Sequence, residues 1–418
     1  MSGTVNLARK MKSQLPAGLV DFMRAAGEVA QSRGNRLYLV GGVVRDQMLE
    51  RTNLDLDLVV EGDAINLAQE LVRIKQGEII THPRFGTAKI QRDKWSIDLV
   101  TARSETYSRP GALPTVKPGS IESDLFRRDF TINAMAVELA PGRYGDLLDL
   151  YGGRGDLEHR LIRVLHEKSF VDDATRIWRG LRYEQRLDFR LEQDTLELLN
   201  RDIPMLDTIS GDRIRHELEL ALKEELPEKV LCRAGELGVL ARLHPSLKGD
   251  GWLAEKFEQA RQLSVPDLPS FGLYLALLAY RLSSEETEQL ISCLRLPKPV
   301  AQIIRDTAGI KAEIGVLSVP GLAPSAIYSL LHGRSSTALT ASSLATGSPA
   351  AEEHIQLYLG ALRHVKTALS GEDLKRMGIA EGPRIKEILN RLREARLDGK
   401  VGSRSEEEEM VRGYKPAG

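Results

Sequence analysis

The chain has 418 residues, of which 42% are hydrophobic and 28% charged, and its formal net charge is −1. The length predicts several packed domains, and the composition excludes a fibrous repeat and a largely disordered chain. Because the charge is close to neutral, a polyanionic partner would have to be bound by basic residues gathered on one surface.

The sequence also argues against membrane insertion, a disulfide framework and a zinc site. The longest apolar stretch, residues 271–280, is about half as long as a membrane span needs, and no apolar signal core stands at the N-terminus. Cys232 and Cys293 are the only cysteines, and neither has partners at metal-ligand spacing. We therefore expect a cytoplasmic protein without membrane contact, and the oligomeric state stays open.

The first third of the chain alternates between helical and β-forming patterns. Residues 1–36 are spaced as a helical lead-in that packs on the β-rich segment after it, and residues 63–75 form an amphipathic helix. Short β-forming runs separated by turn residues lie at 37–40, 56–60, 87–91 and 95–100. The last two runs predict a hairpin that turns near Asp93 and Lys94.

Helical spacing dominates after residue 155. It covers residues 175–187, 193–199 and 213–222, and it continues from 240 onward. The acidic run at 406–409 predicts a solvated helix face. The fold class expected from these patterns is α+β, with a mixed head followed by an all-α remainder.

The first β-forming run leads into two glycines, Gly41 and Gly42, and then into Arg45. Glycines let backbone N–H groups approach phosphate oxygens, a following helix start adds a favourable dipole, and arginine neutralises phosphate charge. This motif favours a phosphate cradle, and an ordinary strand-to-helix turn is the alternative.

Two acids, Asp55 and Asp57, alternate with apolar residues in the next run and so share one sheet face. Hard divalent cations such as Mg²⁺ bind carboxylate oxygens jointly with substrate phosphates, which gives the pair a catalytic interpretation. The alternative is an edge strand with a wet acidic face. Asp98, in the second arm of the hairpin, completes a carboxylate trio as metal ligand or general base, or else forms a salt bridge on the strand face.

Together with the segment Arg127-Arg128-Asp129-Phe-Thr-Ile-Asn133-Ala-Met-Ala, these motifs resemble the class II tRNA nucleotidyltransferase and bacterial poly(A) polymerase family. The resemblance continues at residues 149–153, 172–182 and 371–374, and thus covers nearly the whole chain. It implies a polymerase-β-like nucleotidyltransferase head domain followed by all-α neck, body and tail domains. The implied divisions are a lead-in at 1–36, the head at 37–155, the neck at 156–225, the body at 226–300 and a tRNA-binding tail at 301–418.

The resemblance also implies roles for individual residues. Gly42 and Arg45 contact the triphosphate together with Gly41, Asp55 and Asp57 hold Mg²⁺, and Arg128 and Asn133 frame the nucleotide. The cluster of Arg127 and Arg128 beside Asp129 suits a polyphosphate and a ribose hydroxyl, and a surface ion-pair patch is the alternative.

Four charged residues recur at three-residue spacing and trace a polar stripe on one helix: Asp173, Arg176, Arg179 and Arg182. In the family that the chain resembles, the corresponding Asp and first Arg hydrogen-bond the edge of the incoming base, so that protein selects C or A. Arginine supplies rigid paired donors and aspartate supplies acceptors. A merely solvated stripe is the alternative. Asp172 stands where the family often has Glu, which leaves base selectivity open.

Residues 104–120 lie where the family carries a mobile loop, and their proline-rich sequence leaves open whether CCA, CC or only the terminal A is added. Residues 82–86 predict a packed turn from which Arg84 can reach phosphate. In the helical part, basic residues can bind the phosphates of the acceptor stem and T-arm of tRNA, or pair with nearby Glu. The candidates are Arg213, Arg215, Arg384, Lys386, Arg391, Arg393 and Arg396.

The function implied by the resemblance is metal-dependent addition of C and A, from CTP and ATP, to the 3′ end of tRNA with release of pyrophosphate. Alternatives within the family are a CC-adding or A-adding enzyme and a bacterial poly(A) polymerase, although the basic signature that often accompanies poly(A) synthesis is missing after the Asp-x-Asp. An RNA-binding protein that has lost catalysis would be expected to lack one of the three acids, yet Asp55, Asp57 and Asp98 are all present.

Overall fold

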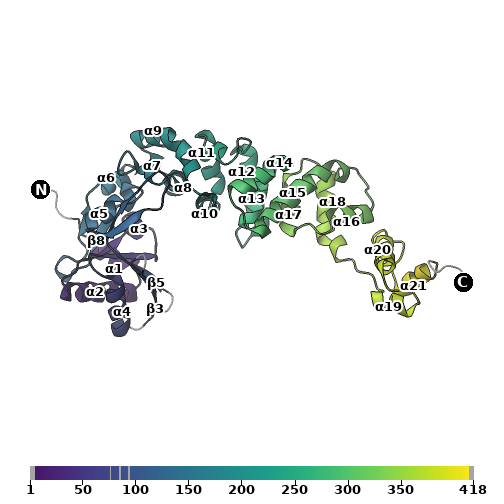
Figure 1. Ribbon diagram of the computed structural model, residues 1–418, viewed down its shortest axis with the longest axis horizontal. Coiled ribbons are helices and arrows are strands. Elements are labelled where there is room, and N and C mark those ends of the chain that lie inside the picture. Colours follow the sequence, from purple (N-terminus) through teal and green to yellow (C-terminus); the bar gives the residue numbers. More distant parts are fainter. Residues whose placement is uncertain (1–4, 76, 84–85, 93–94, 414–418) are drawn as a thin grey trace. The chain divides into compact units, whose positions relative to one another are not determined.

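The computed structural model describes residues 5–75, 77–83, 86–92 and 95–413. The chain divides into two compact units, which we call the N-terminal unit, Met1–Glu217, and the C-terminal unit, Leu218–Gly418. The fold class is α+β, as the sequence predicts, with a mixed sheet in the N-terminal unit and helices in the C-terminal unit (Figure 1). No described helix is both long and apolar enough to cross a membrane.

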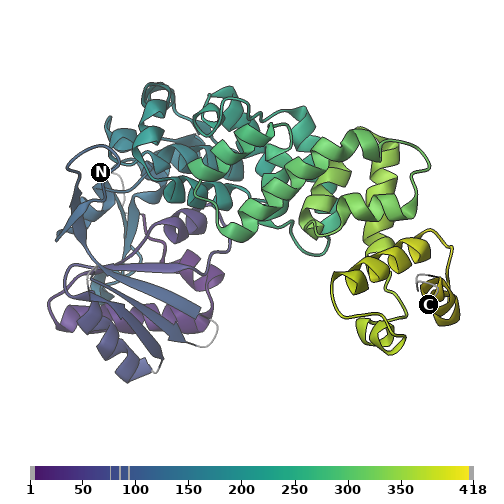
Figure 2. The same cartoon turned by 45° about the vertical axis from the view of Figure 1, so that its right-hand side comes forward.

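A sheet of seven strands forms the centre of the first half of the N-terminal unit (Figures 1 and 2). Its spatial order is β3 (Glu78–His82), β4 (Thr87–Arg92), β5 (Trp95–Thr101), β2 (Leu56–Val60), β1 (Leu37–Val40), β8 (Met135–Glu138) and β9 (Leu147–Asp149). All neighbours are antiparallel except β2 and β5, which run parallel. The four residues of β1 are all buried, because both faces of this central strand are covered.

Helices α2 (Ala17–Ser32) and α4 (Ala64–Lys75) pack against the sheet and each other, and α1 (Ala8–Gln14) lies beside α2 and the short helix α3 (Gly42–Met48). This confirms the predicted helical lead-in and the amphipathic helix. Gly27 of α2 lies so close to the segment after β8 that a Cβ there would stand 1.9 Å from the carbonyl oxygen of Leu139. The helix can therefore approach the sheet this closely only with glycine at that position.

The four predicted β-forming runs are confirmed as β1, β2, β4 and β5, and β4 pairs with β5 as the predicted hairpin. The turn residues Asp93 and Lys94 lie outside the described residues, as does Arg84. Strands β3, β8 and β9 were not anticipated. In the region 104–120, where the resemblance places a mobile loop, β6 (Arg103–Thr106) and β7 (Thr115–Pro118) pair as a hairpin that was not anticipated.

The rest of the N-terminal unit is mainly helical. Its helices are α5 (Ile121–Phe126), α6 (Gly153–Glu158), α7 (Ser169–Asp172), α8 (Thr175–Leu187), α9 (Gln193–Asp202) and α10 (Gly211–Ala221), which runs into the next unit, and its 3₁₀ turns are η2 (Thr131–Asn133), η3 (Pro141–Arg143) and η4 (Ile203–Thr208). The expectation that strands end at residue 155 needs one correction. Two short parallel strands, β10 (Leu161–Ile162) and β11 (Arg190–Leu191), pair beyond that point.

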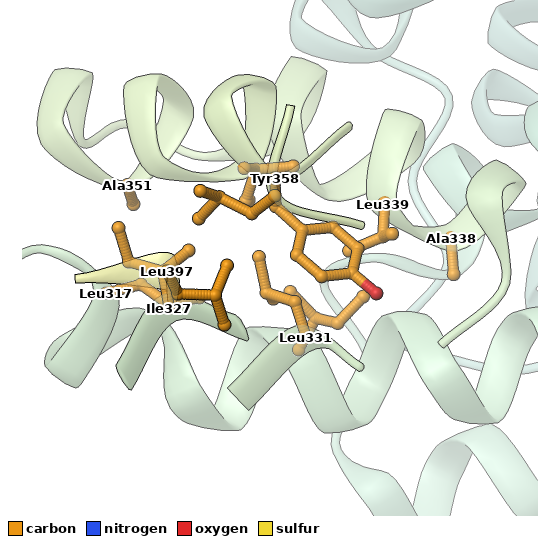
Figure 3. Packing of buried hydrophobic residues seen from close by; sticks show 11 residues of the cluster. Leu317, Ile327, Leu331, Ala338, Leu339, Ala351, Tyr358 and Leu397 are labelled. Atoms are coloured by element: carbon orange, nitrogen blue, oxygen red, sulfur yellow. The ribbon is translucent and has the colours of Figure 1, made fainter. Parts of the chain in front are cut away.

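The described elements of the C-terminal unit are all helical. They are α11 (Pro227–Glu236), η5 (Leu240–Arg242), α12 (Gly251–Ser264), α13 (Phe271–Ala279), α14 (Ser284–Cys293), α15 (Lys298–Leu317), α16 (Pro324–Leu331), α17 (Ser336–Ala345), α18 (Pro349–Gly360), η6 (Leu362–His364), α19 (Gly371–Arg376), α20 (Pro383–Leu397) and α21 (Arg404–Arg412). A buried cluster joins several of them, with Leu317, Ile327, Leu331, Tyr358 and Leu397 close together (Figure 3). Its Leu397 belongs to α20, which links the last helices to this core.

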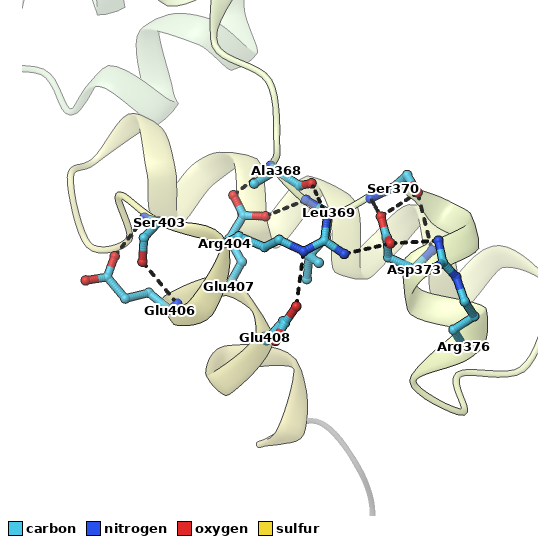
Figure 4. Close-up of polar contacts among 10 residues, drawn as sticks. All are labelled: Ala368, Leu369, Ser370, Asp373, Arg376, Ser403, Arg404, Glu406, Glu407 and Glu408. Carbon is cyan, nitrogen blue, oxygen red and sulfur yellow. Dashed lines mark hydrogen bonds and ion pairs between the residues drawn. The ribbon is translucent and has the colours of Figure 1, made fainter.

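The last three helices are joined by a polar network, of which Figure 4 draws the contacts around α19 and α21. The carboxylate of Glu407 is fully buried and accepts hydrogen bonds from the backbone N–H groups of Ala368 and Leu369 and from Arg396. Asp373 likewise accepts from Arg404, at 2.7 Å. The expectation that residues 406–409 form a solvated face is thus wrong for Glu407, because its carboxylate satisfies the backbone of a neighbouring segment.

Candidate active site

A cavity of about 920 Å³ in the N-terminal unit collects most of the predicted site residues. It is lined by every residue predicted for nucleotide or metal binding except Arg182, and of the three predicted catalytic acids only Asp98 is missing. The predicted residues that line it are Gly41, Gly42, Arg45, Asp55, Asp57, Arg127, Arg128, Asp129, Asn133, Asp173, Arg176 and Arg179.

The register of β1 on β2 brings the glycine turn beside the acids. Val40, the last residue of β1, is the antiparallel partner of Asp57, so the chain reaches Gly41 next to the Asp57 carboxylate. Gly41 has a φ of 79°, and a Cβ there would stand 3.0 Å from Nη1 of Arg128 and 3.4 Å from Oδ2 of Asp57. Glycine is therefore required both by the backbone conformation and by the space between these two groups.

Asp55 is exposed and Asp57 partly buried, and within the described part of the chain no side-chain hydrogen bond or salt bridge joins either carboxylate to another residue. Burial raises the pKa of Asp57 to about 6; the charge of Arg128 lowers it, whereas Asp55 and Asp98 raise it further. Carboxylates that have no protein partner and repel each other beside an open cavity fit a divalent cation, which takes one or two carboxylates together with substrate phosphates.

Asp98 lies beside Asp57 in the sheet, but its carboxylate forms a salt bridge with a different strand. The two residues are partners in the parallel pairing of β2 and β5, yet the Asp98 carboxylate forms a salt bridge of 3.3 Å with Lys89 of β4. Among the described residues, no group of three or more His, Cys, Asp and Glu side chains is placed to hold a metal ion. The expected carboxylate trio is therefore not assembled, and the strand-face salt bridge describes Asp98 better.

Arg45 is buried in a hydrogen-bonded network at the base of the cavity. Its guanidinium donates to both oxygens of Asp46, at 2.8 and 3.0 Å, and to Oδ1 of Asn133 at 2.7 Å. Asn133 in turn donates to Asp129 at 3.0 Å. Three of the five donors of Arg45 are thus taken by protein, so its main local effect is to fix Asn133 and the glycine turn.

Asp129 is buried and pairs with Arg179 of α8 at 2.7 Å. Burial alone would raise the pKa of Asp129, but the charge of Arg179 and the hydrogen bond from Asn133 hold it below its usual value. The same ion pair raises the pKa of Arg179. This pair attaches α8, which carries Arg176 of the predicted base-selecting residues, to the Arg-Arg-Asp motif.

Arg127 and Arg128 both donate to Asp124 of α5. Arg127 also donates to Glu105 of β6 at 3.0 Å, so its guanidinium is paired with two protein carboxylates while it lines the cavity. Arg128 keeps Nη1 near Gly41 and acts electrostatically on Asp57, which places its charge at the acidic end of the cavity.

Asp173 begins the predicted stripe, between α7 and α8. Its Oδ1 accepts from the backbone and hydroxyl of Thr175 and from Arg213 of α10 at 2.7 Å. Arg176 is buried and donates to the hydroxyl of Ser169 and to the backbone oxygen of Arg127, each at 2.7 Å. The expectation of a solvated stripe is excluded for Arg176 and Arg182, because both are buried.

Several cavity residues were not singled out from the sequence. Asp46, Asn53, Glu105, Tyr107, Tyr183 and Arg186 line the cavity beside the predicted groups. Asp46 follows Arg45 at the end of the glycine motif. This position beside a predicted phosphate-binding arginine was the only feature of the sequence that could have marked Asp46 as a site residue. Glu105 and Tyr107 come from β6 and the segment after it, and nothing in their local sequence marks them.

Some of the basic residues predicted to bind RNA have protein partners. Arg213 donates to Asp173, Arg215 pairs with Asp212, Arg391 pairs with Glu387, and Arg396 donates to Glu407. Lys386 of α20 is exposed, and no hydrogen bond or salt bridge joins it to another described residue. It is therefore the clearest candidate of this set for an external contact.

Comparison with known families agrees with this geometry. The model of the poly A polymerase head domain matches residues 37–163. A second model, described as the probable RNA and SrmB-binding site of polymerase A, matches residues 188–250.

Relatives and solved structures extend the match over the whole chain. An A-adding tRNA nucleotidyltransferase of Geobacter sulfurreducens is 36% identical over 95% of this chain, but only 47% of that protein is matched. A CC-adding tRNA nucleotidyltransferase of Deinococcus radiodurans is 31% identical over 97% of this chain and 95% of its own length. A CCA-adding enzyme in an apo form superposes with a TM-score of 0.85 at 32% identity, over 99% of this chain and 100% of that one.

The chain spans about half the length of the first curated relatives that it matches, all of them A-adding. Against the CC-adding relative and the CCA-adding structure the match is nearly complete on both sides. The chain therefore belongs to the tRNA nucleotidyltransferase and poly(A) polymerase family.

Proposed function

We propose that this chain is a nucleotidyltransferase that adds C and A, from CTP and ATP, to the 3′ end of tRNA. The observation that carries the proposal is the meeting of Gly41, Asp57 and Arg128 at one end of a 920 Å³ cavity. There an unpartnered carboxylate, a positive guanidinium and an open backbone turn stand side by side. Family membership supports the same activity, and a tRNA substrate supports a cytoplasmic location.

The reaction is a displacement at phosphorus. The 3′-hydroxyl oxygen of the RNA loses its proton to water and forms a bond to the α-phosphorus of the nucleotide. The bond between the α-phosphorus and the bridging oxygen to the β-phosphate breaks, and pyrophosphate leaves. Asp55 and Asp57 would hold Mg²⁺, which when bound neutralises phosphate charge and stabilises the transition state. Arg128 holds the triphosphate electrostatically, and Gly41 leaves its backbone open to the phosphates.

Base selection is proposed to rest on Asp173 and Arg176, which line the same cavity. Asp173 has one oxygen engaged by Thr175 and Arg213. Its second oxygen remains as an acceptor for an exocyclic amino group, which both C and A carry. Hydrogen bonds to Ser169 and to the Arg127 backbone hold the Arg176 guanidinium in one orientation. Its remaining N–H groups are therefore available to a base in a fixed direction.

Extension of defined tRNA transcripts tests the proposal. Purified protein is incubated with transcripts that end before CCA, after C and after CC, with Mg²⁺ and CTP, ATP or both, and products are resolved to single nucleotides. We expect extension to a complete CCA end. Addition of A only to transcripts that end in CC would instead support the second candidate, an A-adding enzyme, which the Geobacter relative favours.

Two results would count against the proposal. Long tails made from ATP alone would indicate poly(A) synthesis, and an absence of extension matched by an Asp55→Ala variant would indicate an RNA-binding protein without catalysis. The same assay checks the metal requirement: extension should stop when Mg²⁺ is left out and resume when Mg²⁺ is added back.

A further inference from the structure

A second pocket, of about 480 Å³, adjoins the cavity within the N-terminal unit. Four residues line both hollows: Glu105, Tyr107, Arg127 and Arg176. Neither the predicted site residues nor the roles proposed above use the far side of this pocket.

The four shared residues form one hydrogen-bonded partition. The Glu105 carboxylate accepts from the Tyr107 hydroxyl at 3.0 Å and from Arg127 at 3.0 Å. Arg176 closes the partition by donating to the backbone oxygen of Arg127 at 2.7 Å. A ligand group in the second pocket would therefore lie one side-chain layer away from the nucleotide cavity.

The far side of the pocket presents an exposed aromatic surface. Phe126, at the end of α5, is 46% exposed although it stands beside the buried Asp124 and Leu125. Its ring contacts His166 at 5.1 Å between centroids, with 33° between the planes, and Tyr151 at 5.8 Å. Tyr151 is held in place by donating to the backbone oxygen of Glu122. The neighbouring rings thus support Phe126 while leaving much of it open.

The charges around this surface favour a neutral, planar ligand group. Arg127, Arg176 and Lys168 line the pocket, but so do Glu105, Glu167 and Asp172. Balanced charge gives little attraction for a polyphosphate, whereas an exposed aromatic ring stacks on any nucleobase. Burial and the charge of Arg176 lower the pKa of His166, so its ring is largely neutral near pH 7 and adds a flat surface without a charge.

We propose that Phe126, supported by His166 and Tyr151, is a stacking platform for an unpaired base of the RNA near its 3′ end. The inference rests on the proposed function. It adds a binding place for one RNA base while the incoming nucleotide occupies the cavity. The pocket holds this base by stacking, and its position on the other side of the partition keeps it away from Asp55 and Asp57.

Fluorescence of short RNA probes tests this directly. Single-stranded pentaribonucleotides ending in CC carry 2-aminopurine at one position each, and stacking on an aromatic ring quenches that base. With the full-length protein we expect quenching at one position, lost in Phe126→Ala together with an increase of about 5- to 100-fold in the dissociation constant. Phe126→Tyr should restore both. Ile74→Ala, which removes a side chain of 55% exposure from α4 outside both pockets, is the matched control.

The outcomes separate the platform from the proposed function. Unchanged quenching and affinity in Phe126→Ala, with an active wild-type protein, would overturn the platform alone. Weaker binding of free ATP or CTP by Phe126→Ala, with RNA binding unchanged, would assign the pocket to a free nucleotide and also overturn it. A wild-type protein that neither binds nor extends RNA would overturn both.

Discussion

At the scale of single residues, the site is distinguished by charged side chains that form no ion pair with another described residue. Most charged groups in the cavity have protein partners, as Arg45 has in Asp46 and Asp129 in Arg179. Asp55 and Asp57 stand apart because no described side chain neutralises them at contact distance. The repulsion between the two carboxylates would be offset by the proposed Mg²⁺, whereas a structural ion pair is neutralised within the protein itself.

This contrast leads to a prediction for Asp57→Asn. The amide keeps the shape of the side chain but removes the negative charge, so single-turnover extension should slow by roughly 100-fold or more, since metal charge stabilisation is worth several kcal/mol. Binding of ATP and CTP, measured separately by calorimetry, should weaken far less. Asp188→Asn, at an exposed position with φ of 57° that asparagine tolerates, is the control and should leave the rate unchanged. A rate above one tenth of the wild-type value in Asp57→Asn would contradict the assignment.

At the scale of elements, the site is built by strand register. The pairing of Val40 with Asp57 brings the glycine turn beside an acid of the neighbouring strand, whereas Asp98, the partner of Asp57 on β5, forms a salt bridge with Lys89 instead. The sheet can hold this register because β1 is covered on both faces, and α2 contributes to this by the close approach at Gly27.

Gly27→Ala should therefore destabilise the protein even though alanine favours helix. The new Cβ would meet the backbone oxygen of Leu139, which cannot rotate away, so α2 must shift. We expect the free energy of unfolding to fall by about 1–3 kcal/mol, as for other overpacked sites. Urea unfolding of the full chain measures this. Gly155→Ala in α6, where a Cβ meets nothing within 4 Å, should not destabilise, and a loss of equal size there would show that steric contact is not the cause.

At the scale of the whole molecule, the near-neutral net charge means that the proposed RNA substrate would have to be bound by local groups and not by a global field. Each unit has a core of its own, and the C-terminal unit ends in three helices tied by Glu407 and Asp373. Several arginines of the C-terminal unit, such as Arg396 and Arg404, form ion pairs within the protein. The proposed contacts with RNA phosphates would therefore come from a smaller set of exposed basic residues.

Lys386→Gln should consequently change the salt dependence of RNA binding. If Lys386 neutralises one phosphate, the slope of log affinity against log salt should fall by about 0.7–0.9, because fewer counterions are released. Fluorescence anisotropy with labelled tRNA over a series of KCl concentrations measures the slope. Lys12→Gln removes the same charge from α1 and serves as control. An equal change in both variants would mean that only net charge matters, and an unchanged slope in Lys386→Gln would exclude the contact.

Much of the fold followed from local patterns. The runs at 37–40 and 56–60 coincide with β1 and β2, because short apolar runs of β-forming residues are typical of strands buried within a sheet. The helical spacing at 175–187 coincides with α8. Strands β6 and β7 were missed because the segment between them contains Pro110 and Pro114, β7 is exposed and ends in Pro118, and the two strands pair only with each other. Glu407 was misjudged because an acidic run carries no sign of the backbone N–H groups that bind it.

The sequence by itself determined the α+β class, the family and many of the residues that line the cavity, since motifs at short range carry that information. Only the tertiary structure decided how those residues are used. It turned the Asp98 carboxylate to Lys89, buried Arg176 between Ser169 and the Arg127 backbone, and left Asp55 and Asp57 without a partner among the described side chains. The physical reason is that a carboxylate or guanidinium acts according to which charges lie within a few ångströms, and that depends on strand register and helix packing between distant segments.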